Sequence, residues 1–284
     1  MKRSVSVLLA LVVVVGLAAP ALAQTVLEKI SRTGVLTAGT RTASIPFAFI
    51  NEKNEWIGFS VDFLEVVRAR LEKKLGKPVK LEKKEVTPAN RIALVANRTI
   101  DVECGSTTYT RGRDETVDFT INFFFTGSQL LVKRGSGVKM LADVAGKRVG
   151  AAQGTTNEKA LRVSAPRADI VTFQDHAAGF LALEQGKIVA YVTDGILLAG
   201  LAAKSKSPKD WEVVGDFFSK DPYSCIVPEN DSKWRDFVNH TLMELIDSGK
   251  YFELYEKWFG EKGVVPYPMS AQVRNYMLMQ SMPE

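Results

Sequence analysis

The segment Asn90–Arg113 reads NRIALVANRTIDVECGSTTYTRGR. It contains the pattern of a helix followed by a strand, together with a group of polar side chains. Its opening residues have the apolar spacing of a short helix, and Ile100–Cys104 alternates like a buried strand. Arg91 and Arg113 bracket the hydroxyl cluster Ser106–Thr108. A guanidinium pairs with a carboxylate through two parallel hydrogen bonds, and hydroxyls supply further donors. The segment therefore predicts a carboxylate site, with a solvated basic helix and turn as the alternative.

Strands and helices alternate on both sides of this segment. Upstream, Val35–Gly39 is typical of a buried strand, and a helix with an apolar stripe begins near Phe59 and ends before Gly76 and Pro78. The alternation restarts after a glycine-rich break, with strands expected at 148–152, 169–173 and 189–192 and helices at 177–185 and 196–204. This pattern predicts an α/β fold with mainly parallel sheets flanked by helices.

The restart predicts two lobes within the chain. We expect residues 24–132 and 227–284 to form lobe 1, and residues 133–226 to form lobe 2. The apolar strands Gln129–Lys133 and Cys225–Val227 are the expected crossings between the lobes and would act as the hinge. A methionine-bearing tail after the last predicted helix is expected to pack on lobe 1.

The N-terminus has the pattern of a secretory signal peptide. Lys2 and Arg3 precede an uncharged run over Ser4–Ala19, and Ala21–Ala23 has the small-residue spacing of a cleavage site. A membrane anchor is the alternative, but the apolar core is short for a membrane span. We expect residues 1–23 to be removed and the mature protein to begin near Gln24 in the periplasm.

The charge balance argues against a nucleic-acid partner. Without Lys2 and Arg3 the net charge falls from +5 to +3. Basic clusters such as Lys73-Lys74 and Lys83-Lys84 are interrupted by acidic residues and lack interleaved aromatic side chains, so they fit solvated surfaces better. The chain has no Cys/His metal spacing and no phosphate-binding glycine loop, so neither a metal nor a cofactor is expected.

The only cysteines are Cys104 and Cys225. An exported chain meets an oxidising compartment, so we expect these two residues to form one disulfide. Two unpaired buried thiols are the alternative.

Several short motifs together carry a resemblance to a known family. They are Arg41 with Ser44–Phe47, Asn90–Ile92, Asp101–Thr108, Gly154–Thr156, Asp175-His176, Thr193-Asp194 with Leu197–Gly200, and Lys250–Phe252 with Lys257–Phe259. With them the chain resembles the periplasmic glutamate/aspartate-binding proteins of ABC importers, within the family 3 solute-binding proteins. The resemblance runs from about Thr25 to Phe259 and implies the two-lobed (type II) periplasmic-binding-protein fold.

The resemblance also implies a role for each polar residue of the site. One group would hold the α-carboxylate of an amino acid: Ser106, Thr108, Arg113 and Thr155. A second group would surround the side-chain carboxylate: Arg41, Arg91 and His176. Asp194 would bind the α-ammonium group, and nearby cations are expected to keep Asp194 ionised.

Each lobe-2 residue in this set also has a purely structural alternative. Thr155 follows Gly154 at a strand-to-helix turn, where it can cap the helix and still lie beside an anion. Asp194 ends a predicted strand, which is where open α/β sheets bind ligands, but it can also cap the next helix. His176 taken alone would more often be a surface or capping histidine.

Two positions depart from the pattern of the acidic-ligand relatives. Pro88 stands where a serine is expected, and Ala152 stands where a threonine is expected. Each change removes one hydroxyl, which could shift affinity or the glutamate-to-aspartate preference about tenfold. Glutamine or asparagine remains the alternative ligand, although it would leave Arg41 and Arg91 without a negative charge to neutralise.

The expected mechanism is hinge closure around the ligand, followed by recognition of the closed monomer by a membrane permease. A second class of function is a periplasmic enzyme resembling cyclohexadienyl dehydratase, which needs a carboxyl group with a raised pKa as general acid. Because Asp194 is assigned to the ammonium group and is expected to be ionised, we predict a binding protein and not an enzyme.

Overall fold

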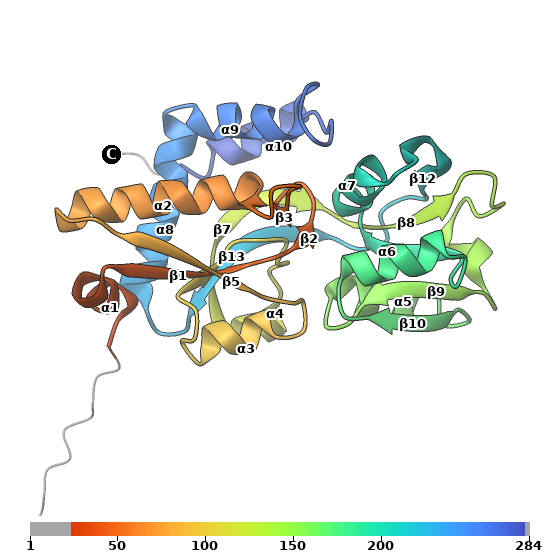
Figure 1. The fold of residues 1–284 in the computed structure, drawn as a ribbon, viewed down its shortest axis with the longest axis horizontal. Coiled ribbons are helices and arrows are strands. Elements are labelled where there is room, and N and C mark those ends of the chain that lie inside the picture. The colour runs from red at the N-terminus through yellow and green to blue at the C-terminus, as the bar shows by residue number, and fades with distance from the viewer. Residues whose placement is uncertain (1–23, 282–284) are drawn as a thin grey trace, which may run out of the picture.

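The protein consists of two lobes that lie side by side (Figure 1). The computed structural model describes residues 24–281, so the predicted signal peptide, residues 1–23, lies outside the described residues. Each lobe contains one five-stranded sheet, and helices cover both faces. The predicted α/β class and two-lobed architecture are confirmed. Between Gln24 and Ser281, no helix is long and apolar enough to span a membrane.

The sheet of lobe 1 has the strand order β5-β1-β6-β13-β7. Strands β5 and β6 pair in parallel with β1, whereas β13 runs antiparallel to β6 and β7. The strands are β1 (Val35–Thr40), β5 (Lys80–Glu85), β6 (Val102–Glu103), β7 (Val117–Thr126) and β13 (Asp221–Pro228). The helices are α1 (Val26–Thr33), α2 (Phe59–Leu75), α3 (Arg91–Ala96), α4 (Arg111–Asp114), α8 (Ser232–Asp247), α9 (Lys250–Phe259) and α10 (Ala271–Leu278).

The sheet of lobe 2 has the strand order β10-β9-β11-β8-β12. Its first three strands are parallel, and β8 is antiparallel to both of its neighbours. The strands are β8 (Ser128–Lys133), β9 (Arg148–Ala152), β10 (Asp169–Phe173), β11 (Ala190–Asp194) and β12 (Trp211–Val214). The helices are α5 (Thr156–Ser164), α6 (His176–Glu184) and α7 (Gly195–Lys204), with short 3-10 turns at Leu141–Val144 and Pro208–Asp210.

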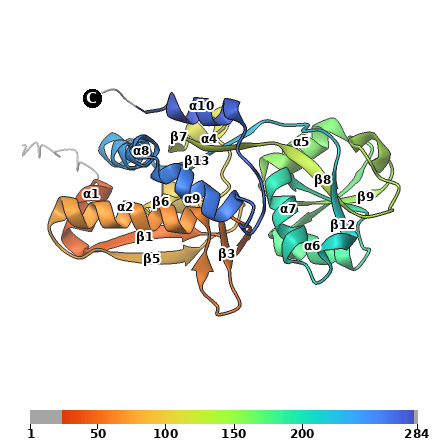
Figure 2. The ribbon, with the colours of Figure 1, turned by 90° about the horizontal axis from the view of Figure 1, so that it is seen from above.

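A small third sheet lies where lobe 1 meets α6 and α7 of lobe 2 (Figures 1 and 2). It comprises β2 (Ala43–Ser44), β3 (Ala48–Ile50) and β4 (Trp56–Ile57). Phe47 precedes β3 and is fully buried against the rings of Phe59, Phe124 and Tyr223. These edge-to-face contacts anchor the hairpin in the core of lobe 1.

The crossings between the lobes differ from the sequence prediction. Both predicted crossing strands form, but β8 pairs with β11 and β12 and so belongs to lobe 2, whereas β13 belongs to the sheet of lobe 1. The chain therefore crosses at Gly127 and again between Val214 and Asp221, and not at residues 132 and 226. An apolar strand pattern marks a strand but does not show with which sheet it pairs.

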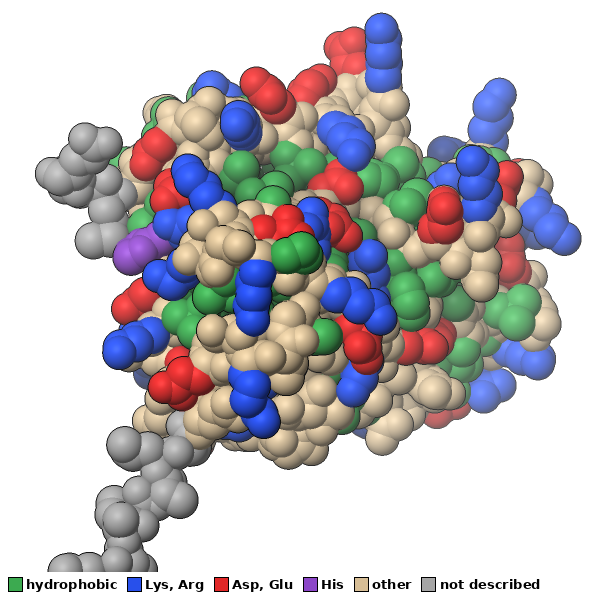
Figure 3. All heavy atoms as spheres, turned by 60° about the vertical axis from the view of Figure 1, so that its left-hand side comes forward, with side chains coloured by type: hydrophobic (Ala, Val, Ile, Leu, Met, Phe, Trp, Pro, Cys, Tyr) green, Lys and Arg blue, Asp and Glu red, His purple; other side chains and the backbone are tan. Residues whose placement is uncertain are grey.

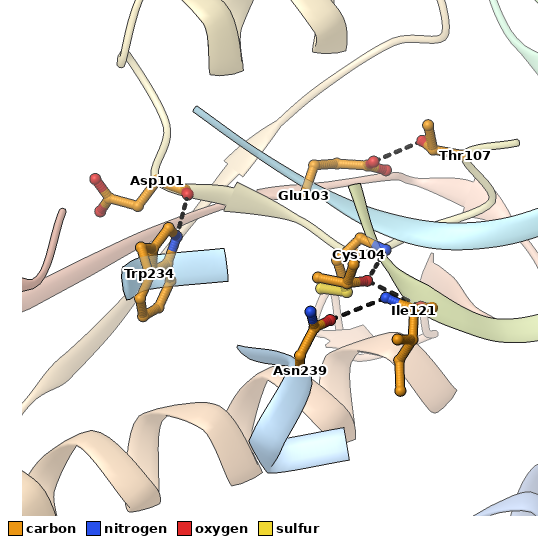
Figure 4. The surroundings of a disulfide bond; sticks show 9 residues. Asp101, Glu103, Cys104, Thr107, Ile121, Trp234 and Asn239 are labelled. Carbon is orange, nitrogen blue, oxygen red and sulfur yellow. Dashed lines mark hydrogen bonds between the residues drawn. A yellow bond between two sulfur atoms is a disulfide. The ribbon is translucent and has the colours of Figure 1, made fainter. Parts of the chain in front are cut away.

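The disulfide and the tail agree with the expectations. Cys104 is bonded to Cys225, which joins the end of β6 to β13 inside the core (Figure 4). The tail packs on lobe 1, because Met277 of α10 is fully buried in its core and Gln280 donates a hydrogen bond to the carbonyl of Asn122 at 2.8 Å. The face of lobe 1 in Figure 3 carries interspersed acidic and basic side chains, as the interrupted clusters predict.

Candidate functional site

The residues of the predicted site gather between the two lobes. Arg41, Arg91, Ser106, Thr155 and Asp194 each lie at or shortly after the carboxyl end of a strand in the parallel part of its sheet. This edge of an α/β sheet is where ligands bind. Of the eight predicted residues, Arg113 is half-buried and the others are buried. The structure thus brings residues far apart in the chain into one polar cluster.

Arg41 is the most unusual member of this cluster. It follows β1, and only 2% of its surface is exposed. Among the described residues, neither terminal guanidinium nitrogen has a hydrogen-bond partner. Burial, together with the charge of Arg91, lowers the pKa of Arg41 to about 10, so the group remains charged at neutral pH. Buried polar groups are normally satisfied, so this guanidinium is poised to bind an anion.

Arg91 is the first residue of α3 and lies close to the loop that carries the hydroxyl cluster Ser106–Thr108. Its Nη1 donates to the carbonyl oxygen of Ser106 at 3.1 Å, while its Nε has no partner within residues 24–281. Burial lowers the pKa of Arg91, and the charge of Glu103 opposes this effect. The Ser106 hydroxyl donates to the hydroxyl of Ser44 at 3.3 Å. Hydrogen bonds therefore connect Arg91 to Ser106 and Ser106 to Ser44.

Arg113 and Thr108 connect lobe 1 to lobe 2. Arg113 Nη1 donates to the carbonyl of Thr108 at 2.8 Å, and its Nη2 donates to the carbonyl of Gly154 at 3.2 Å. Thr108 donates to Asp221 Oδ1 at 2.9 Å, and the Thr156 hydroxyl of lobe 2 donates to the same oxygen at 2.8 Å. The lobes therefore contact each other directly through polar groups of the site.

His176 begins α6 and is fully buried. Its Nδ1 lies 2.9 Å from the hydroxyl of Tyr191. Burial, and then the charges of Arg41 and Arg91, lower the pKa of His176 well below its usual range, so the ring is neutral at neutral pH. In the neutral tautomer that accepts from Tyr191 at Nδ1, the opposite ring nitrogen is a donor. His176 can therefore offer one hydrogen bond without adding charge.

Thr155 is the N-cap of α5, which is the structural alternative considered from its sequence. Its hydroxyl accepts from the amide of Glu158 at 3.0 Å and donates to the carbonyl of Ala152 at 2.7 Å. The preceding Gly154 has a φ of +77° and lies against Pro88 and Ala89 of lobe 1. Pro88, one of the two departures, is thus part of the contact between the lobes.

Asp194 departs from the expectation that neighbouring cations keep it ionised. Burial, followed by the nearby charge of Asp221, raises the pKa of Asp194 to about 8. The carboxyl accepts from the hydroxyl of Tyr223 at 2.6 Å and from Asn157 Nδ2 at 3.1 Å. Hydrogen bonds and the charge of Arg91 act in the opposite direction but are outweighed. Sequence reasoning underestimated desolvation and could not place Asp221 beside this carboxyl.

This raised pKa predicts a pH effect on the protein free of ligand. Unfolding restores a pKa of about 3.9, so the contribution of Asp194 to stability is complete below pH ~4 and is lost as the pH rises towards 8. Asp194→Asn mimics the protonated form and removes this dependence. We expect the difference between the melting temperature of Asp194→Asn and that of the wild type to increase, in favour of the variant, as the pH rises from 5 to 8. A constant difference across this range would contradict the assignment.

Sequence reasoning missed several polar residues of the cluster. They are Glu103, Asn157, Tyr191, Asp221 and Tyr223. Tyr191 and Glu103 lie within strands, where their side chains are indistinguishable by pattern from core or surface positions. Asn157 in the first turn of α5 and Asp221 at the start of β13 are typical of capping and turn residues. Only the three-dimensional structure shows that all five lie in or beside the polar cluster.

Comparisons with known proteins agree with this architecture. Residues 36–261 match the family described as bacterial extracellular solute-binding proteins, family 3. The chain is 38% identical to the L-glutamate/L-aspartate-binding protein of Pseudomonas aeruginosa, across 96% of this chain and 95% of that protein. It is 34% identical to the glutamate/aspartate import solute-binding protein of Escherichia coli, across 91% and 89% of the two chains.

A solved structure supports the same assignment. An ancestral arginine-binding protein bound to glutamine is 32% identical and superimposes with a TM-score of 0.74, covering 80% of this chain and 99% of the other. The sequence match covers most of the chain, and the structural match includes both lobes. This protein therefore belongs to the bacterial extracellular solute-binding proteins of family 3.

Proposed function

We propose that this protein captures an acidic amino acid, L-glutamate or L-aspartate, and delivers it to the permease of an ABC importer. The observation that carries the proposal is the guanidinium of Arg41, which is buried between the lobes with two nitrogens that lack partners among the described residues. An anion is the natural partner for such a group. The relatives from P. aeruginosa and E. coli are named for glutamate and aspartate, which supports the same ligand.

The charged groups of the site match the three charged groups of such a ligand. Arg113, Ser106 and Thr108 would hold the α-carboxylate, together with the amide end of α5 at Thr155. Asp194 would bind the α-ammonium, and this positive charge would favour its ionised form. Arg41, Arg91 and the donor nitrogen of neutral His176 would hold the side-chain carboxylate. These assignments rest on the family resemblance and on the burial and proximity of the groups.

Hinge closure is the proposed route of capture. The site takes residues from both lobes, and within residues 24–281 the chain connects them at two segments, Gly127 and the stretch between Val214 and Asp221. Rotation about these segments would open the site for entry of the ligand. We further propose that residues 1–23 direct export, that the mature protein works in the periplasm, and that it is a monomer.

A neutral amide ligand is the main alternative. Glutamine would leave a guanidinium in the side-chain subsite without a counter-charge, which is costly in a buried site. Ala152 removes a hydroxyl beside Thr155, and Pro88 packs against Gly154 without offering one. Because these changes affect hydrogen bonding and leave Arg41 and Arg91 in place, we expect them to alter affinity more than ligand charge.

An enzyme of the dehydratase type is a second candidate, and one observation favours it. With its pKa raised to about 8, Asp194 has the protonation behaviour of a general acid. However, both oxygens of its carboxyl already accept hydrogen bonds from Tyr223 and Asn157. Both relatives named above are binding proteins by name, and the E. coli protein is named for import, which supports a binding function for this chain as well.

Titration calorimetry tests the proposed function. The mature protein, unfolded and refolded to remove ligand acquired during expression, is titrated with L-glutamate, L-aspartate, L-glutamine and L-asparagine. We expect micromolar or tighter binding of an acid and at least tenfold weaker binding of its amide. Binding of the amides alone, or of none of the four, would refute an acidic-ligand site and favour a remodelled pocket.

A further inference from the structure

Glu103 is a buried carboxylate without a role in the proposed binding site. None of its surface is exposed, and its Oε2 accepts a hydrogen bond from the hydroxyl of Thr107 at 2.6 Å. Its Oε1 has no hydrogen-bond partner in the described part of the chain. Figure 4 shows its side chain reaching Thr107 and pointing away from Trp234 and Asn239 of α8. An unsatisfied buried carboxylate oxygen is costly, so its position calls for an explanation.

Glu103 and Arg41 both pack closely against Gly105. A methyl group at Gly105 would lie 2.3 Å from Glu103 Oε1 and 3.5 Å from Arg41 Cγ. The carboxylate and the stem of the arginine therefore lie over the same glycine, although Glu103 and the terminal nitrogens of Arg41 form no hydrogen bond. The guanidinium remains free to bind another anion.

The influence of Glu103 extends to all three site arginines. Burial is the largest effect and lowers the pKa of Arg41, Arg91 and Arg113, whereas the negative charge of Glu103 raises the pKa of each. Arg91 also lowers the pKa of Arg41 and of Arg113, so these guanidinium groups repel one another. A carboxylate within this cluster reduces that repulsion in the protein free of ligand.

We propose that Glu103 is an internal counter-anion that competes electrostatically with the side-chain carboxylate of the ligand. It holds the arginines together when the site is empty and repels an acidic ligand when the site is filled. Its charge thereby limits the affinity for glutamate and sets how strongly the protein prefers glutamate to glutamine. This inference rests on the proposed function.

Glu103→Gln tests the inference because it removes the charge and keeps the size of the side chain and an acceptor for Thr107. We expect calorimetry on the mature protein to show glutamate binding about tenfold tighter and glutamine binding changed by less than about threefold. The melting temperature of the ligand-free variant should fall, because its arginines lose their counter-charge. A merely structural role would lower the melting temperature without raising the preference for glutamate.

Two further variants separate charge from hydrogen bonding and from folding. Thr107→Val removes the hydrogen bond that Thr107 donates to Glu103 but keeps the charge of Glu103, so the preference for glutamate should not rise. Gly105→Ala keeps every charge but displaces Oε1 of Glu103, so the preference should rise, by less than in Glu103→Gln. If Glu103→Gln does not fold, the inference is tested with Gly105→Ala.

The outcomes separate this inference from the proposed function. If the wild type binds glutamate and neither Glu103→Gln nor Gly105→Ala raises the preference over glutamine, Glu103 is not a competing counter-anion. An equal rise in Thr107→Val would likewise overturn the inference, because the preference would then rise while the charge of Glu103 is still present. If the wild type binds neither acid, the proposed function fails, and the inference fails with it.

Discussion

Replacing Arg41 with methionine is expected to weaken glutamate binding by at least about 100-fold and to raise the melting temperature of the ligand-free protein. Two charge-assisted hydrogen bonds would be lost from the complex, each worth about 1.5 to 3 kcal/mol. In the free protein the same substitution removes a buried cation whose terminal nitrogens lack partners within residues 24–281. Removing such a group should stabilise the fold by about 1 to 3 kcal/mol, or roughly 3 to 10 °C.

Arg70→Met is the matched control for this experiment. Arg70 is another arginine of lobe 1, but its Nη1 donates to the carbonyl of Phe237 at 2.9 Å and to the Thr241 hydroxyl at 3.0 Å. Its loss should lower the melting temperature and leave glutamate binding unchanged. Calorimetry measures glutamate binding and thermal melting measures stability. Arg41→Met should lose binding and gain stability, whereas Arg70→Met should keep binding and lose stability. Undiminished glutamate binding by Arg41→Met would remove Arg41 from the ligand site.

Removing the disulfide is expected to cause the largest loss of stability. Cys104 and Cys225 are separated by 121 positions in the chain. Closing a loop of this length restricts the unfolded chain, which corresponds to about 4 to 5 kcal/mol in the chain-entropy treatment. The double variant Cys104→Ala/Cys225→Ala should therefore lose about this much free energy of unfolding, measured by urea denaturation.

The slope of the urea transition distinguishes this cause from a packing defect. Without the cross-link the unfolded chain is less compact, so the dependence of the unfolding free energy on urea should become steeper. Cavities left by the two sulfur atoms would lower stability without changing the slope. A loss below about 1 kcal/mol would show that the cross-link does little for the thermodynamic stability of this protein.

Much of the fold could be predicted from local sequence patterns. The strands at Arg148–Ala152 and Asp169–Phe173 form at the predicted residues, and α2 ends at Leu75, directly before Gly76, which has a φ of +64°. The small sheet of β2, β3 and β4 was missed because strands of two or three residues are too short to show a period. The ten-residue strand β7 was missed because its apolar residues follow no strict alternation.

The site could be predicted only in part for a related reason. Arg41, Arg91 and Asp194 stand out because their residue types and motif context indicate ligand chemistry. The pairings of Asp221 with Thr156 and of Tyr223 with Asp194 depend on contact between the lobes, which leaves no local pattern in the chain. The protonation state of Asp194 was mistaken because burial outweighs the neighbouring positive charges.

The position of β13 in the first sheet determines the order in which the lobes can be completed. Lobe 2 is one continuous stretch from β8 to β12, so its sheet can form without any later part of the chain. The sheet of lobe 1 needs β13 between β6 and β7, and β13 is made only after lobe 2. Contacts so distant in the chain form slowly. Lobe 2 is therefore expected to fold first. Its folding would bring β13 close to β6 and β7, so that the folded lobe 2 promotes the completion of lobe 1.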